Sequence, residues 1–435
     1  MKRSNFINRS PYLYIVIGFA AVILLGSGIL MLPISLQQPI AYIDALFVST
    51  SAVCITGLSS VTLQTVFTPF GKIVIALLIQ IGGLGFTTVA MAVFALLGVK
   101  LGISEKFLVQ ETLGSAQHID FRKFLFRAIA ISFIAEGIGF CINLIALCGD
   151  YSGIQLVGYS AFQSISAFNN AGFDLFGATS LIAFDDNALL LLNTAFLTIV
   201  GGLGFLVIND IFTIRRRKRL AEHTKLVLCI TAGLLTLGTV GFLLSELGKI
   251  DFLNAFFMSA MTRTCGFTSV DLSQWSNASI LLADFLMFIG AGPASTGGGI
   301  KCTTFFIVCA AAIAFIRGKP VVIFHRSIGK DLVARCMLIT LFAAACVFVA
   351  GTSICALDPE YSTAHVFFET ISAFANVGLS AGITADLSVG SKVILCLSMY
   401  IGRIGFITAL MVLRKRWNRG DDETIRCAPA EILVG

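Results

Sequence analysis

Long apolar runs follow one another along the chain and are separated by short polar segments. A helix needs about 20 apolar residues to cross the roughly 30 Å hydrocarbon core of a bilayer, and eight runs reach that length. The pattern therefore predicts an all-α polytopic membrane protein whose spans are grouped in pairs. The predicted spans cover residues 13–32, 70–98, 125–148, 187–213, 226–248, 278–316, 333–356 and 391–413.

A shorter apolar phrase lies between the two spans of each pair and ends in glycine. It starts with an aromatic residue, continues with small residues and reaches the glycine ten positions later. Such a segment is too short to span a bilayer, so we predict four re-entrant pore helices whose following turns line a watery path. A repeat at this period indicates similar units around one pseudo-four-fold pore. The phrases are Phe47–Gly57, Phe162–Gly172, Phe256–Gly266 and Phe368–Gly378.

The repeats divide the chain into four units, each with a span, a pore helix, a filter turn and a second span. Their expected bounds are residues 1–98, 99–222, 223–319 and 320–435. The third unit has a broken second span with a gate loop, and the fourth includes a cytoplasmic C-terminal tail. The first apolar run shows no cleavage site, so we expect it to be the first span.

The turn before each glycine is the candidate selectivity filter. Rings of backbone carbonyls replace the hydration shell of a cation, and glycine allows the backbone that points them inward. The alternative, in which each glycine only caps a helix, explains one copy more readily than four at the same offset. The predicted filter residues are Cys54, Ile55, Thr56 and Gly57; Asn169, Asn170, Ala171 and Gly172; Thr264, Cys265 and Gly266; and Ala375, Asn376, Val377 and Gly378.

The second spans carry another glycine phrase, at residues 82–86, 201–205 and 402–406, where small residues let helices approach closely. The run 278–316 would be about 58 Å long as one helix, so it must be broken. We predict an intramembrane gate at the break, with a simple kink as the alternative; Lys301 lies too late for a phosphate-binding loop. The predicted gate residues are Gly290, Ala291, Gly292, Pro293, Ala294, Ser295, Thr296, Gly297, Gly298, Gly299 and Lys301.

Arg403 is a charge in the middle of the last predicted span, where insertion costs about 2.5–3.5 kcal/mol. We expect it to lie below the filter, either facing the pore or paired with an acid such as Asp284 or Glu136. Arg263 and Glu369 are candidates for a second buried pair that braces the filter.

Composition supports a membrane protein, because 57% of the residues are hydrophobic and 12% are charged. Most of the 30 Lys and Arg residues lie in the N-terminal tail, the connections between units and the C-terminal tail. The positive-inside rule then predicts cytoplasmic termini and pore loops that enter from outside. The opposite side is acidic, which serves either solvation or local enrichment of cations. The twelve cysteines form no CxxC pair, so neither a disulfide framework nor a zinc site is indicated.

These motifs resemble the Trk/Ktr/HKT superfamily of potassium transporters over essentially the whole chain. The chain starts directly with the first unit, which is more similar to the Ktr-type translocating subunit than to the longer Trk type. Cys54 and Cys265 stand where relatives more often have Thr or Ala. The segments that carry the resemblance are Gly28–Pro33, Ile43–Leu58, Ile79–Phe86, Ser166–Phe173, Arg263–Phe267, Met287–Phe305 and Ile401–Phe406.

The resemblance implies four covalently linked potassium-channel-like units around one pore, in the cell membrane. It assigns K+ binding to the filter carbonyls, gating to Gly290–Gly299 and a barrier below the filter to Arg403. Relatives that prefer sodium have serine at the first filter glycine, so Gly57 implies potassium. The resemblance also implies a homodimer, sodium stimulation and a cytosolic RCK-type regulatory ring. The chain has no Rossmann fold, so any nucleotide is expected on that ring alone.

Two alternatives stay open at this stage. One is a sodium-conducting transporter or a sodium-coupled potassium symporter of the same superfamily. The other is a membrane-embedded enzyme, which requires a cluster of His, Asp, Glu or Cys at membrane depth that the sequence does not contain. Neither an enzymatic activity nor a nucleic-acid partner is expected.

Overall fold

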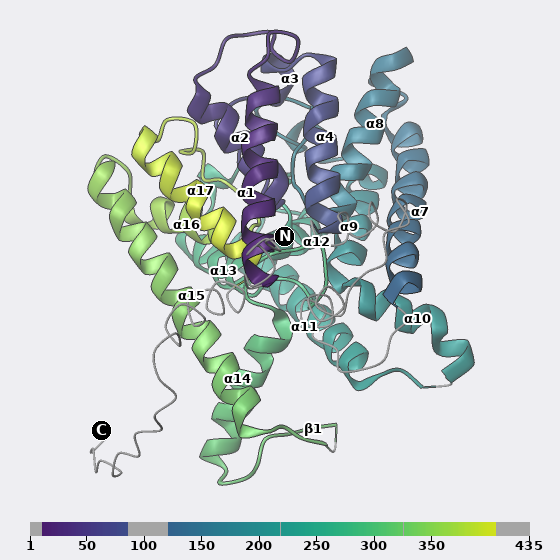
Figure 1. Ribbon diagram of the computed structural model, residues 1–435, viewed down its shortest axis with the longest axis vertical. Coiled ribbons are helices and arrows are strands. Elements are labelled where there is room, and N and C mark those ends of the chain that lie inside the picture. The colour runs from purple at the N-terminus through teal and green to yellow at the C-terminus, as the bar shows by residue number, and fades with distance from the viewer. Residues whose placement is uncertain (1–10, 86–120, 218, 325, 406–435) are drawn as a thin grey trace, which may run out of the picture.

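The computed structural model describes residues 11–85, 121–217, 219–324 and 326–405, and helices dominate them (Figure 1). The helices repeat in the predicted order of first helix, pore helix and second helix. The first helices are α1 (Pro11–Leu30), α7 (Phe121–Leu147), α11 (Glu222–Ser245) and α15 (Lys330–Leu357). The pore helices are α2 (Tyr42–Cys54), α8 (Gly153–Phe168), α12 (Phe252–Thr264) and α16 (Thr363–Ala375). The second helices are α4 (Pro69–Leu84), α9 (Ala188–Leu203), α13 (Asn277–Phe288) and α17 (Val389–Ile404).

Shorter elements connect these helices. An antiparallel hairpin of β1 (Val322–Ile323) and β2 (Arg326–Ser327) lies between α14 and α15; the sequence did not predict it. The remaining connecting elements are α3 (Leu63–Val66), η1 (Ile182–Phe184), α10 (Phe205–Arg217), η2 (Leu272–Gln274) and α14 (Cys302–Ile316).

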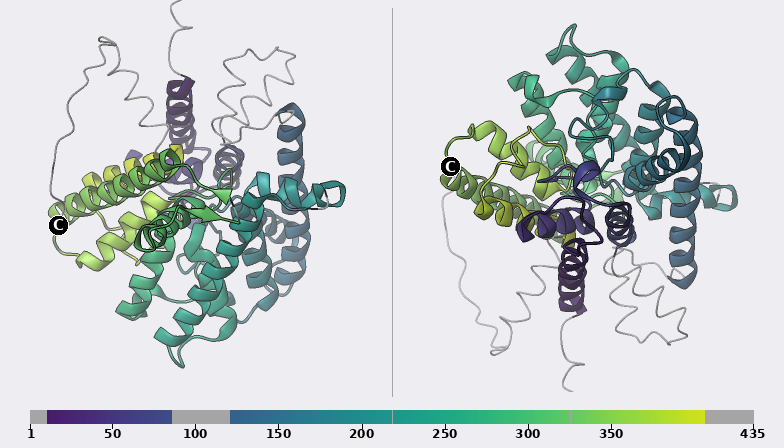
Figure 2. Two further views of the ribbon diagram at one scale, coloured as in Figure 1. Left: turned by 90° about the horizontal axis from the view of Figure 1, so that it is seen from below. Right: turned by 90° about the horizontal axis from the view of Figure 1, so that it is seen from above.

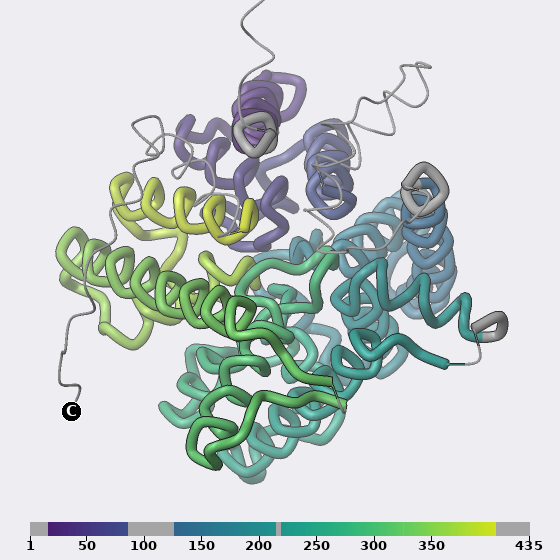
Figure 3. The backbone as a smooth tube through the Cα atoms, turned by 60° about the horizontal axis from the view of Figure 1, so that its bottom comes forward, coloured from purple at the N-terminus to yellow at the C-terminus, as the bar shows by residue number. Residues whose placement is uncertain are grey.

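The four units surround a common centre in chain order, so that the first lies beside the last (Figures 2 and 3). Each pore helix packs on the first and second helices of its own unit and on the second helix of the preceding unit. The pairs between units are α8 on α4, α12 on α9, α16 on α13, and α2 on α17. The last pair closes the ring, as expected for a pseudo-four-fold arrangement.

Burial is inverted relative to a soluble protein. The first helices carry exposed apolar side chains, such as Leu24 (57% exposed), Ile134 (63%) and Leu341 (71%). By contrast, every residue of α2 from Phe47 to Cys54 is buried, although several of them are Ser or Thr. Apolar side chains on the outside and small polar ones inside are the pattern expected of helices that face lipid and enclose a pore.

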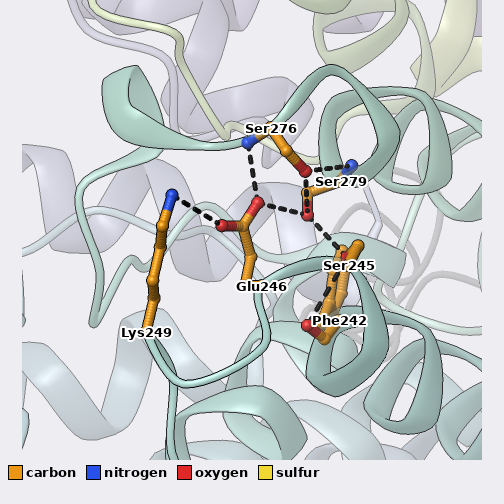
Figure 4. A network of polar contacts seen from close by, with 6 residues as sticks. All are labelled: Phe242, Ser245, Glu246, Lys249, Ser276 and Ser279. Atoms are coloured by element: carbon orange, nitrogen blue, oxygen red, sulfur yellow. Dashed lines mark hydrogen bonds and ion pairs between the residues drawn. The ribbon is translucent and has the colours of Figure 1, made fainter.

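The second helices all begin with a side-chain cap, and in the third and fourth units an acidic residue at the end of the first helix holds that cap. In the third unit, Glu246 follows α11 and accepts hydrogen bonds from the Ser276 N–H (2.7 Å) and the Ser279 hydroxyl (2.7 Å) (Figure 4). In the fourth, Asp358 accepts from both the N–H and the hydroxyl of Ser388. The four N-caps are Thr68, Asn187, Ser276 and Ser388.

The sequence predicted a break only in the second span of the third unit, and the continuous course predicted for the other second spans was wrong. In the described part of the chain, three helices are long and apolar enough to cross a membrane alone, and α9 with α10 makes a fourth crossing only as a pair bent by 94°. The second helices α4, α9 and α17 end just before Gly85, Gly204 and Gly405, which have φ of 80°, 94° and 79°. Positive φ ends a right-handed helix, whatever the apolarity of the following residues. The remainders of spans 70–98 and 391–413 lie outside the described residues.

Candidate functional site

Three pore helices end in the same backbone turn. A residue in the left-handed conformation comes directly after α2 and α16, namely Ile55 (φ 60°) and Asn376 (φ 54°), and Asn170 (φ 59°) comes one residue later, after Asn169, at the end of α8. The next N–H then bonds back to a carbonyl five residues earlier, as in a left-handed helix cap. These bonds join Thr56 to Ser51 (2.8 Å), Ala171 to Ser166 (2.8 Å) and Val377 to Ser372 (2.9 Å).

The filter glycines are therefore not the helix caps in these units. They come two residues after the cap, with φ of 97° at Gly57, 72° at Gly172 and 96° at Gly378. The alternative in which each glycine only ends a helix is wrong there. The helices also take in part of the predicted filter: Cys54, Thr264 and Ala375 are the last helical residues of α2, α12 and α16.

The four glycines meet around one axis. A Cβ built on Gly57 would lie 2.5 Å from the Ala171 carbonyl oxygen, and one on Gly266 would lie 2.7 Å from the Gly378 carbonyl. A Cβ on Gly172 would collide with the backbone of Gly266, and one on Gly378 with the Thr56 carbonyl. Each unit thus touches the next one, and the fourth touches the first. The approach is closer than any other residue permits.

The third unit departs from the pattern. Cys265 is extended (φ −148°), and Gly266 is not among the glycines with positive φ. Its helix α12 ends with a direct bond from the Cys265 N–H to the Met261 carbonyl (2.9 Å). The four predicted filter segments thus comprise three similar turns and one extended segment, so the symmetry of the sequence repeat is only approximate at this level.

In the first and fourth units, a serine of the pore helix holds the N–H of the glycine. The hydroxyl of Ser51 accepts a hydrogen bond from the Gly57 N–H (3.0 Å), and that of Ser372 does the same for Gly378 (3.0 Å). Sequence reasoning noted only that these positions are small. The available signal was a hydroxyl six residues before the glycine in three of the four phrases; Ala260 stands at this position in the third.

The predicted gate segment is a loop between α13 and α14 that lies against the filter turns. A Cβ built on Gly297 would lie 2.6 Å from Cγ2 of Thr264, and one on Gly299 would lie 3.2 Å from the Ala375 carbonyl. The Lys301 ammonium donates to the Gly297 carbonyl (2.7 Å). Residues 289–301 separate the two helices, so a simple kink is wrong. The loop thus lies against the ends of the third and fourth pore helices.

Backbone hydrogen bonds fix the base of this loop, both to itself and to the second unit. Gly290 and Ile300 pair across its two ends (2.9 Å). The Gly292 N–H donates to the Gly202 carbonyl (3.0 Å), and the Phe205 N–H donates to the Ala294 carbonyl (2.9 Å). Phe205 begins α10, so the loop is joined to the point where the second helix of the second unit bends.

Arg403 contacts the predicted gate loop, and its predicted acidic partners were wrong. Its guanidinium donates to two backbone carbonyls, those of Thr296 in the loop and Gly82 at the end of α4. Asp284 Oδ1 is buried without a hydrogen-bond partner, and Glu136 instead accepts from Gln80 (3.0 Å) and Asn169 (3.0 Å).

The expected pair of Arg263 and Glu369 is not formed either. Glu369 accepts hydrogen bonds from the Ser380 hydroxyl (2.5 Å), the Ala381 N–H (3.0 Å) and the Thr384 hydroxyl (2.8 Å). These donors lie just beyond the fourth filter glycine. Glu369 thus braces the entrance of the filter, while Nε of the buried Arg263 has no hydrogen-bond partner.

A cavity of about 610 Å³ opens on the other side of the glycine ring, and all four filter glycines line it. Its charged lining residues are Asp174 and Asp271, with no Lys or Arg in the described lining. Burial raises the pKa of the Asp174 carboxyl to about 6. Hydrogen bonds from Ser273 hold the pKa of Asp271 below its usual value. Asp271 therefore keeps a negative charge in this vestibule below pH 6, and Asp174 adds a second one above that pH, so the vestibule attracts cations.

Comparison with known proteins places this geometry in a family. The model of the TrkH family, described as cation transport protein, matches residues 4–421. The chain belongs to this family. It is 38% identical to the Ktr system potassium uptake protein B of Bacillus subtilis, with 99% of this chain and 98% of that protein covered. The chain is also 39% identical to the Ktr system potassium uptake protein B of Vibrio alginolyticus, with 92% of this chain and 90% of that protein covered.

A third relative, the potassium/sodium uptake protein NtpJ of Enterococcus hirae, is 34% identical over 95% of this chain and 94% of its own length. The crystal structure of the potassium transporter TrkH from Vibrio parahaemolyticus has the same fold, with a TM-score of 0.74 at 18% identity, covering 96% of this chain and 88% of that one. The resemblance to the Trk and Ktr proteins is thus confirmed. Membership of a cation transport family also decides against the membrane-embedded enzyme.

Proposed function

We propose that this chain is the ion-translocating membrane subunit of a Ktr-type potassium uptake system. The observation that carries the proposal is the closed ring of Gly57, Gly172, Gly266 and Gly378, with a cation-attracting vestibule on one side and a polar loop on the other. Backbone carbonyls around such a ring are suitable ligands for dehydrated K+. The two Ktr relatives, named for potassium uptake, support the choice of ion.

The transport needs no hydrolysis step in this chain. We infer that the vestibule faces outward and that both termini are cytoplasmic, because Lys and Arg concentrate in the tails and in the connections between units. An inside-negative potential then supplies about 2.3 kcal/mol per elementary charge per 100 mV, which drives K+ inward.

The loop Gly290–Gly299 is the proposed gate, and Arg403 holds it in the closed position. In the described conformation the loop fills the path beneath the filter, and the Arg403 guanidinium holds the Thr296 carbonyl. The charge of Arg403 also opposes the passage of a cation at that depth. The regulator that we propose is a cytosolic RCK-type ring, and the nucleotide binds to this ring and not to the membrane chain. We also propose that the membrane chain forms a homodimer and that sodium stimulates its transport.

The first experiment measures rubidium and potassium uptake by cells that lack their own potassium uptake. These cells express the chain with and without a Ktr-type ring, in buffer with and without sodium. Saturable uptake that the ring increases supports the proposal. Absence of uptake, with the protein demonstrated in the membrane, excludes it. Sodium uptake in place of potassium supports the second candidate, a sodium-conducting or sodium-coupled transporter, which the relative named for potassium and sodium favours.

A deletion of residues 291–298 tests the gate. It removes the contacts of the loop with Thr264, Gly202 and Arg403. We expect a higher potassium flux and weaker control by the cytosolic regulatory ring. Unaltered flux and regulation in a deletion variant with normal membrane levels exclude the loop as the gate.

A further inference from the structure

Two asparagine side chains join the filter turns to the loop. Asn170 and Asn376 occupy the same position, two residues before the filter glycines Gly172 and Gly378, and both are fully buried. Both also have the left-handed backbone, with φ of 59° and 54°. The two side chains therefore start from the same backbone conformation.

Each amide nitrogen ties its own unit to the next one. Nδ2 of Asn170 donates to the Thr198 carbonyl in α9 (3.1 Å) and to the Thr264 hydroxyl in the third unit (2.5 Å). Nδ2 of Asn376 donates to the Met399 carbonyl in α17 (2.9 Å) and to the Thr56 hydroxyl in the first unit (2.9 Å). The two threonines belong to neighbouring filter segments, so each asparagine spans a boundary between units.

Both amide oxygens face the loop. Oδ1 of Asn170 accepts a hydrogen bond from the Thr296 hydroxyl (2.8 Å). Oδ1 of Asn376 has no hydrogen-bond partner, and a Cβ built on Gly298 would collide with it. Of the two equivalent links to the loop, only the one through Asn170 is completed by a hydrogen bond.

Thr296 is the loop residue through which other units hold the loop tip. Its N–H donates to the Gly201 carbonyl (3.3 Å), its hydroxyl to Asn170, and its carbonyl accepts from Arg403. The partners belong to the second and fourth units. Withdrawal of the loop breaks all three bonds at once.

We propose that Asn170 transmits the position of the loop to the filter, so that opening the gate also changes ion selectivity. The proposal rests on the function proposed above. With the loop seated, Thr296 fixes the amide, and the amide fixes the Thr264 hydroxyl beside the third filter segment. Once Thr296 leaves, the buried oxygen has no donor, and such groups find another partner. When the amide turns to reach that partner, its nitrogen leaves the Thr264 hydroxyl.

An amide suits this role because it donates and accepts at the same time. A carboxylate accepts only, and an apolar side chain does neither. Asn170 acts through Thr264 and is a positioning residue; it is not assigned contact with the ion.

The test replaces the Thr296 hydroxyl by a methyl group of similar size, Thr296→Val, in the full chain with its regulatory ring. Loss of a net hydrogen bond of about 1 kcal/mol predicts roughly a fivefold rise in potassium flux. We also expect a severalfold fall in the ratio of potassium to sodium uptake. Thr296→Ser restores both values. Thr236→Val is the matched control, because the Thr236 hydroxyl bonds only within α11 (2.9 Å) and faces outward.

A double-mutant cycle with Thr264→Val separates transmission from a local effect. If Asn170 links the two hydroxyls, the selectivity loss of the double variant equals that of the stronger single variant. Losses that multiply, or a Thr296→Val protein with higher flux and unchanged selectivity, overturn the proposal. Membrane levels and melting temperatures identify variants that fail to fold. If the wild-type protein shows no potassium uptake, the proposed function itself is refuted. This result differs from a failure of the coupling through Asn170, in which the wild type still takes up potassium.

Discussion

Replacing the first filter glycine, Gly57→Ser, tests the glycine ring directly. Gly57 has φ of 97°, and a Cβ there would lie 2.5 Å from the Ala171 oxygen and 3.2 Å from Cα of Gly172. Both neighbours are backbone atoms of the next filter segment. They cannot rotate away as a flexible side chain does, so the first and second units must move apart at the filter.

The expected size follows from two effects. A side chain in such a backbone region costs about 1–3 kcal/mol, and the protein recovers part of this only by changing the turn that carries the Thr56 carbonyl. A wider, altered ring binds the larger ion less selectively. Each 1.4 kcal/mol lost from potassium binding relative to sodium binding is a factor of ten. We expect the ratio of potassium to sodium uptake to fall by about tenfold or more.

The assay compares the initial uptake rates of the two ions in cells that lack their own potassium uptake, at equal protein levels in the membrane. Gly248→Ser is the matched control. Gly248 also has positive φ (78°), but nothing lies within 4 Å of a Cβ at that position, and it is remote from the filter. The control has a similar backbone cost and keeps wild-type selectivity.

One result would refute this reasoning. If Gly57→Ser is present in the membrane and retains wild-type selectivity, the ring does not discriminate ions. A loss of selectivity in Gly248→Ser as large as in Gly57→Ser would assign the effect to general destabilisation. The filter role would then need another test.

Three further predictions concern the vestibule, the contact of Arg403 with the gate loop, and the boundary between the fourth and first units. With its pKa raised to about 6, Asp174 is charged above that pH, so the apparent potassium affinity should weaken as external pH falls from 7 to 5; Asp174→Asn should show the weak value at both pH values. Arg403→Gln removes the fork between the Thr296 and Gly82 carbonyls and should raise flux severalfold, and Arg403→Lys should not restore closure because lysine lacks that fork. Lys392→Met leaves Asp44 without its hydrogen-bond donor and should cost about 1–3 kcal/mol, measured as a lower melting temperature in detergent, whereas unchanged stability argues against the pair (3.1 Å).

The arrangement of four pore helices around one centre was predictable from the spacing of the glycines alone. Four glycines at the same offset, each between two apolar runs, specify four pore helices, and the first one observed, Tyr42–Cys54, overlaps the phrase Phe47–Gly57. The broken third span was also predictable, because its length exceeds a bilayer. The breaks after Leu84, Leu203 and Ile404 were not. Hydropathy continues through these points, and the sign of φ at a glycine is not visible in composition.

The polar contacts below the filter were harder to predict for a physical reason. A search for partners of Arg403 considers acids, since their side chains are visible in a sequence. Its actual acceptors are backbone carbonyls, which every residue has. Asn170 and Asn376 were expected to contribute their carbonyls, and the role of their side chains was missed. The signal was an asparagine at the same offset in two repeats.

The boundary between the last and first units explains why side chains matter so much in this protein. The chain joins consecutive units covalently, but it does not join the fourth to the first. In a bilayer, lipid competes for apolar surfaces, so hydrogen bonds and close packing must set the register of such a boundary. Arg403 lies in this boundary and also holds the gate loop, so a shift of α17 relative to α4 would pull on the loop. Arg403 thus takes part both in the contact between the fourth and first units and in the proposed gating. The polar side-chain contacts across the boundary include Lys392 with Asp44 (3.1 Å), Asn376 with Thr56 (2.9 Å), Tyr400 with Val16 (2.5 Å) and Arg403 with Gly82.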